Sequence, residues 1–112
     1  MPYINRIMLL GNVGQDPEFS SYPGGDMMAR FSLATTKKYT NRSGEKKELT
    51  TWHRITVTGK AVDVVRGYVR KGSLVFIEGE QLNGSYTNTS GQTIPTSEVK
   101  VVNLQILNTQ TT

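Results

Sequence analysis

An aromatic ring and a positive charge stand two residues apart in segment 50–58, which is rich in β-branched residues and contains neither Pro nor Gly. Such a composition predicts a β-strand. Because strand side chains alternate between two faces, Trp52 and Arg54 share one face with three threonines. A flat indole beside a guanidinium suits a stacked base and its phosphate. The segment therefore predicts a nucleic-acid-binding surface.

The opposite face of this strand carries His53 together with Ile55 and Val57, two residues that favour a core. His53 is the single histidine of the chain, which excludes an all-histidine metal site. The sequence also lacks the Gly-x-Ser-x-Gly elbow of serine hydrolases. We therefore predict that His53 is a core or subunit-interface residue and not a catalytic one.

Other residues that could form a phosphate-binding, acid–base or metal-binding motif lack the sequence context that such a motif requires. The glycines at 11 and 14 are followed by no Lys-Ser or Lys-Thr pair, so they predict a turn and not a phosphate loop. Asp16 and Glu18 flank Pro17, a context that favours turn hydrogen bonds or a helix cap over acid–base catalysis. There is no cysteine, hence no disulfide and no thiolate metal site. We predict no enzymatic activity, no cofactor and no metal.

Two further aromatic residues stand in basic or polar company. Tyr39 follows Lys37 and Lys38, and Tyr86 stands on a polar hairpin. With Trp52 they predict a stacking track on adjacent arms of one barrel, worth about 1–3 kcal/mol per stacked base. For Tyr86 the alternative of a packed surface residue is the strongest, because its hairpin has few charges.

Positive charge is concentrated in the middle of the chain. The 112 residues carry a formal net charge of +4, yet residues 30–71 hold eleven basic residues against three acidic ones. The remainder is net acidic, with two basic and six acidic residues. This asymmetry is typical of a nucleic-acid-binding surface, although a solvated charged face is the alternative.

The elements that must position these residues follow from hydrophobic periodicity. We predict strands at 3–13, 27–39, 50–58, 74–82 and 99–107, a short extra strand at 18–21, and a polar hairpin at 83–95. A helix from residue 60 would bury Ala61, Val64, Val65 and Tyr68. Phe31 and Phe76 should also be buried, Gly79 should lie at a bulge or bend, and Val102, Leu104 and Ile106 should share a face.

Five main strands with a helix between the third and the fourth predict an all-β OB-fold, a Greek-key barrel that binds oligonucleotides or oligosaccharides. We assign one domain to residues 1–107 and a disordered end to 108–112. No window approaches the roughly 18 apolar residues of a membrane span, and the N-terminus lacks a signal-peptide pattern. The expected location is therefore cytoplasmic.

Several motifs in this order resemble the homotetrameric single-stranded DNA-binding protein family of bacteria and mitochondria. They are NRIMLLGNVGQDPE at 5–18, FSLAT at 31–35, GE at 44–45, TWHR at 51–54, GK at 59–60, YVRKGS at 68–73 and IEG at 77–79. The resemblance implies an OB-fold that assembles as a dimer of dimers and wraps single-stranded DNA.

The resemblance also implies residue roles. Trp52 matches the central stacking tryptophan, and Tyr39 and Tyr86 stand where many members have Trp. His53 matches a subunit-interface histidine. The expected phosphate-contacting residues are Arg6, Lys37, Lys38, Arg54, Lys60 and Lys71.

Three departures from the family pattern stand out. Thr58 replaces a stacking Phe, and residues 83–85 (NGS) replace the usual basic run. The sequence ends at Thr112 without the Gly/Pro-rich linker and acidic tail through which bacterial members recruit replication and repair enzymes. This pattern suggests a trimmed core, a tail-less relative, or a plasmid or phage version.

The expected function is binding of single-stranded DNA with little regard to sequence, in replication, recombination and repair. Two alternatives remain open at this point. One is an OB-fold for RNA or for a replication-restart complex, and the other is a structural oligomerisation module for which the basic middle is only a solvated face.

Overall fold

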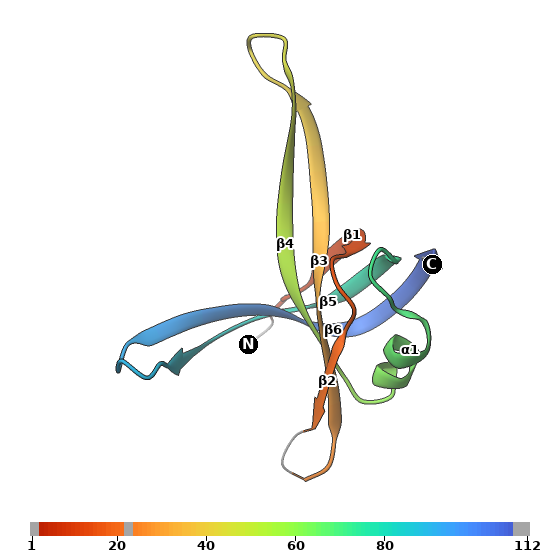
Figure 1. Ribbon diagram of the computed structural model, residues 1–112, viewed down its shortest axis with the longest axis vertical. Helices are drawn as coiled ribbons and strands as arrows, with labels where there is room; N and C mark the ends of the chain where they lie inside the picture. Colours follow the sequence, from red (N-terminus) through yellow and green to blue (C-terminus); the bar gives the residue numbers. More distant parts are fainter. Residues whose placement is uncertain (1–2, 22–23, 109–112) are drawn as a thin grey trace.

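Six strands and one helix make up residues 3–21 and 24–108, the part of the chain that the computed structural model describes (Figure 1). The elements are β1 (Ile7–Val13), β2 (Glu18–Ser21), β3 (Met27–Thr40), β4 (Lys46–Thr58), α1 (Ala61–Tyr68), β5 (Leu74–Thr87) and β6 (Thr93–Asn108). The strand order is β1-β5-β6-β4-β3-β2, and β1 also pairs with β3. These pairings close a barrel of five strands with β2 added at the edge, so the predicted OB-fold is confirmed.

Barrel closure depends on β1, which pairs with two strands. It is antiparallel to β5 over most of its length, and its last two residues pair with Ala34 and Leu33 of β3. A Cβ atom at Gly11 would collide with the main-chain carbonyl of Ala34. Only glycine therefore allows β1 to approach β3 closely enough at this crossing. The remaining closure is a short parallel pairing of β4 with β6 at Ile55 and Val99.

The core is formed by the inward-facing side chains of all five barrel strands and is covered at one end by α1. Phe31, Leu33, Ile55 and Ile77 are among its buried members. Phe31 is buried as predicted, whereas Phe76 is only half-buried.

The prediction for the helix is wrong about which stripe faces the barrel. Val62 and Val65 are buried, whereas Val64 is exposed and Tyr68 is 63% exposed. Valines at 62, 64 and 65 allow two overlapping apolar stripes, and periodicity alone does not choose between them. The stripe that packs against the barrel continues past the helix to the buried Val69.

Strand β6 contains a β-bulge that changes which side chains face inward. Glu78 pairs with Asn103 and Gly79 pairs with Val101, so Val102 is an extra residue without a partner. Val102 is consequently 66% exposed, and the prediction that it shares a face with Leu104 is wrong. The predicted bulge at Gly79 is confirmed.

Two hairpins extend from the barrel as long arms, β3–β4 and β5–β6 (Figure 1). Their strands are longer than predicted, because most side chains on the outer parts of the arms are exposed on both faces and give no hydrophobic alternation. Each tip is closed by an asparagine side chain. Asn41 Oδ1 accepts hydrogen bonds from the amides of Ser43 and Glu45, and Asn88 Oδ1 accepts them from Ser90 and Gln92.

The described residues include no helix that is long and apolar enough to cross a membrane. The predicted disordered end covered 108–112. Asn108 is the last residue of β6, and residues 109–112 lie outside the described part.

Candidate nucleic-acid interface

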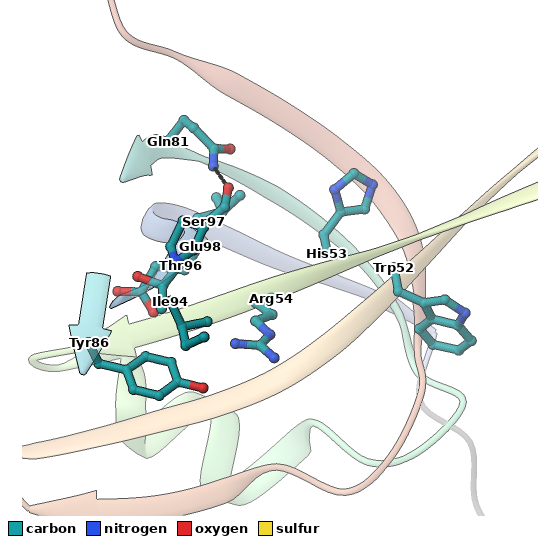
Figure 2. A pocket seen from close by; sticks show the side chains of 11 residues that line it. Trp52, His53, Arg54, Gln81, Tyr86, Ile94, Thr96, Ser97 and Glu98 are labelled. Carbon is teal, nitrogen blue, oxygen red and sulfur yellow. Dashed lines mark hydrogen bonds between the residues drawn. The ribbon is translucent and has the colours of Figure 1, made fainter. Parts of the chain in front are cut away.

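A shallow groove runs between β4 and the β5–β6 arm on the outer face of the sheet. Trp52 and Arg54 line it from β4, and Tyr86 lines it from β5 (Figure 2). On β3, the residues opposite Trp52 and Arg54 are Ala34 and Ser32, whose small side chains leave this face open. The register therefore builds one surface from three strands.

The indole of Trp52 lies against a glycine and is otherwise open to solvent. It is 60% exposed. A Cβ atom at Gly14 would lie 3.0 Å from Cη2 of Trp52 and closer still to Cζ3, so the ring packs directly on the backbone there. The β1–β2 turn thus fixes the indole from one side and leaves much of its surface accessible for stacking.

Two arginine side chains place positive charge in the groove. Arg54 lines both hollows of the groove, and Arg30 lines the second one together with Tyr86. Neither guanidinium takes part in an ion pair among the described residues. Arg30 was missing from the predicted phosphate contacts. The sequence did contain the signal, because alternation puts Arg30 on the same face of β3 as Ser32 and Ala34.

Tyr86 lies on the same outer face as Trp52 and Arg54. Its cross-strand neighbour on the arm is Ile94, and its ring is 55% exposed. Figure 2 shows the phenol reaching from the arm toward Arg54 across the groove. The β5–β6 arm therefore supplies a second aromatic surface to the groove.

Tyr39 lies on the other face of the β3–β4 ribbon. Tyr39 pairs with Lys47, and in the same unbroken register Leu33 pairs with His53. Residues an even number of positions apart on a strand share a face. Tyr39 therefore lies on the face of Leu33, which points inward at the barrel. Within one chain, the predicted track of three aromatic side chains is thus reduced to Trp52 and Tyr86. Lys37 shares the face of Tyr39, whereas Lys38 shares the face of Trp52 and lies 3.8 Å from the Glu48 carboxylate.

The other predicted cations lie away from the groove. Arg6 lies 3.8 Å from a carboxylate oxygen of Glu78. Lys60 precedes α1, and Lys71 follows it. The amide of Lys71 donates a hydrogen bond of 2.9 Å to Asp16 Oδ1. Asp16 therefore makes a structural bond between two loops, in place of the turn or helix-cap bond that was predicted.

His53 points to the side of β4 opposite Trp52 and Arg54 (Figure 2). It is half-buried, and its Nε2 lies 2.9 Å from Thr35 Oγ1 at hydrogen-bonding distance. The inward phase predicted from alternation is therefore correct. Among residues 3–21 and 24–108, no cluster of three or more His, Cys, Asp or Glu side chains is arranged to hold a metal ion.

Comparison with known proteins adds two kinds of similarity. A family model described as the single-strand binding protein family matches residues 4–107. The solved structure of a Plasmodium falciparum SSB complex with ssDNA is similar with a TM-score of 0.89 and 33% sequence identity, covering 96% of this chain and 98% of that chain. A deletion mutant of the single-stranded DNA binding protein from Thermus aquaticus has a TM-score of 0.81 at 23% identity. That match covers 94% of this chain and 51% of the Thermus chain, and it concerns the fold alone.

Proposed function

From the premise that this chain belongs to the single-strand binding protein family, we propose that it binds single-stranded DNA with little regard to base sequence. It thereby coats and protects unpaired DNA in replication, recombination and repair. The observation that carries the proposal is the exposed indole of Trp52 on the same outer face as Arg54 and Tyr86. The similar Plasmodium protein is described in complex with ssDNA, which supports the same ligand here.

Stacking supplies the part of the affinity that does not depend on base identity. Every base has a flat π-face, so Trp52 and Tyr86 can accept any of them, at about 1–3 kcal/mol per stacked base. Both rings are more than half exposed and need no rearrangement of the core to receive a base. We propose that Tyr39 contributes from the opposite face of its ribbon, where a strand that wraps around the molecule would meet it.

Phosphate pairing supplies the second part. Arg54 and Arg30 line the groove beside the aromatic rings and have no carboxylate partner among the described residues. Counterion release at such contacts makes affinity fall linearly with the logarithm of salt concentration. We propose Arg6, Lys37, Lys38, Lys60 and Lys71 as further phosphate contacts along the path of the DNA outside the groove.

Membership in this family makes the chain a binding protein and not an enzyme. It also disfavours the two alternatives, an RNA or restart module and a purely structural oligomer. RNA is the alternative that experiment separates most directly, because a reader of the 2′-hydroxyl prefers RNA over DNA of equal length.

We propose that the protein acts as a homotetramer, a dimer of dimers. An exposed apolar strip on β1 supports an interface, because Met8 is 63% exposed and Leu10 lies opposite the half-buried Phe76 of β5. His53 is a second proposed interface residue. Native mass measurement should give four copies, both with and without DNA. We further propose one DNA-binding domain over residues 1–107 and a cytoplasmic location at the nucleoid.

Fluorescence of Trp52 tests the proposed function directly, because it is the single tryptophan of the chain. Titration with oligo(dT) at low salt should quench the emission, and added salt should reverse the quenching. Double-stranded DNA and an RNA oligonucleotide of equal length serve as competitors and should displace oligo(dT) poorly. Unchanged emission at low salt, together with no shift of a labelled oligonucleotide, would refute single-stranded DNA binding.

A further inference from the structure

Glu98 is the one carboxylate that lines both hollows of the groove, whereas Asp16 and Glu18 line the second hollow alone. Glu98 is on β6, on the same face as Ile94 and Thr96, and it lines both hollows together with Arg54 and Tyr86 (Figure 2). A negative charge at this place repels phosphate, which the neighbouring arginines attract. Neither stacking nor phosphate pairing therefore accounts for Glu98.

One oxygen of this carboxylate is anchored and the other is open. Glu98 Oε2 accepts a hydrogen bond of 2.8 Å from the hydroxyl of Thr56, a residue that is itself buried. Within the described part of the chain, Oε1 accepts no hydrogen bond, and Glu98 takes part in no ion pair although Arg30 and Arg54 line the same hollow. The geometry thus holds a hydrogen-bond acceptor at a fixed place in the hollow that Trp52 and Tyr86 also line.

Base edges can satisfy such an acceptor and phosphates cannot, because an ionised carboxylate needs an N–H or O–H donor. Guanine presents two neighbouring donors, N1–H and the N2 amino group, which match the two oxygens of a carboxylate. Thymine presents a single N3–H between two carbonyl oxygens, which a carboxylate repels. Carboxylates in protein–DNA interfaces accept hydrogen bonds from bases in the same way.

On the premise of single-stranded DNA binding, we propose that Glu98 is a specificity-determining residue of the groove. Its carboxylate accepts two hydrogen bonds from one base edge, through Oε1 and through the lone pair of Oε2 that Thr56 leaves free, and repels phosphate from this part of the groove. Phosphates are then held by Arg30 and Arg54, which lie on the β3–β4 side of Glu98. At this one nucleotide position the protein favours guanine over thymine, whereas the stacking positions remain tolerant of any base.

The test compares the native chain with Glu98→Gln, which keeps an acceptor for Thr56 and removes the charge. Competition against a labelled oligonucleotide, read by anisotropy, gives the Kd for oligo(dT), for an alternating thymine–guanine oligonucleotide, and for one with hypoxanthine in place of guanine. The ratio of affinities for thymine–guanine over oligo(dT) should fall about five-fold in the variant. Hypoxanthine lacks the N2 amino group and should give an intermediate ratio with the native chain.

Glu80→Gln is the matched control. Glu80 is exposed on β5 and lines neither hollow, so the same charge change there should leave the ratio unaltered. Thr56→Val, which releases the Glu98 carboxylate, provides a second variant and should also lower the ratio. If either variant binds with the native ratio at unchanged melting temperature, base reading by Glu98 is refuted while DNA binding stands. If no oligonucleotide binds to the native chain, the proposed function itself fails.

Discussion

The indole of Trp52 owes its position to a neighbour that has no side chain. Gly14 adopts no left-handed φ, unlike six other glycines, so its backbone would tolerate alanine. What requires glycine there is the contact with the ring and with the Ser32 hydroxyl, whose Oγ would lie 2.8 Å from an added Cβ. A residue that touches no DNA can therefore control how the stacking surface is presented.

Gly14→Ala should displace the indole of Trp52 and weaken DNA binding, by less than the roughly 1–3 kcal/mol expected for loss of one stacking ring. The position of the Trp52 emission maximum and the Kd for oligo(dT) report the two effects. Gly67→Ala is the control, because a Cβ at that exposed helix position meets no neighbour. Equal emission spectra and equal Kd values for native protein and Gly14→Ala would contradict a positioning role.

Truncation of the two rings in the groove should have unequal effects. Trp52→Ala should cost about 2–3 kcal/mol of binding free energy and Tyr86→Ala about 1 kcal/mol, because the indole offers the larger surface and is held by Gly14. Anisotropy of a labelled oligonucleotide measures both variants without relying on tryptophan emission. A larger loss for Tyr86→Ala would place the main contact on the arm instead of the barrel wall.

At the scale of single elements, the sequence predicted the strands of the barrel better than their faces. Alternation within β3 puts Tyr39 on the face of Leu33 and Arg30 on the opposite face, so both faces could have been assigned from the sequence. Two other assignments could not be made from the sequence. The choice between the stripes of α1 depends on packing, and the exposure of Val102 depends on the pairing of Val101 with Gly79, which leaves Val102 unpaired. Both require knowledge of which elements meet.

The two stripes of α1 can be told apart by stability. Val65 is fully buried, so Val65→Ala should lower the free energy of unfolding by about 2 kcal/mol through lost burial and the cavity left behind. Val64→Ala, at an exposed position one residue away, should change it by less than about 0.5 kcal/mol. Urea denaturation measures both. The opposite ranking would mean that the helix packs through the stripe first predicted from the sequence.

At the scale of the whole molecule, fold and ligand class could be predicted because the motifs run in order through the chain and match a family model over residues 4–107. The site could be predicted only in part. The structure joins Trp52, Arg54 and Tyr86 on one groove and distributes the other predicted cations over the surface. How many of those cations meet DNA depends on the path of the strand, which no local pattern encodes.

Salt dependence measures how many groove cations meet phosphate. Arg54→Ala should reduce the slope of log Kd against log salt by about one, and Arg30→Ala combined with Arg54→Ala by about two. Arg66→Ala is the control, because its guanidinium lies over the Phe19 ring, 5.0 Å from the centroid, on the α1 side of the barrel. An unaltered slope in the double variant would show that phosphates bypass the groove.

The short junction of β4 with β6 has a consequence for cooperativity. Only two residue pairs join these strands, Ile55 with Val99 and Thr56 with Lys100, and the Thr56–Glu98 bond spans the same place. A nucleotide chain lying over the groove would brace the barrel at one of its two shortest strand pairings, the other being β1 with β3. DNA binding would then also suppress local opening of the barrel at this junction. Addition of DNA should therefore slow amide hydrogen exchange more in the β4–β6 pairing than in the β1–β5 pairing.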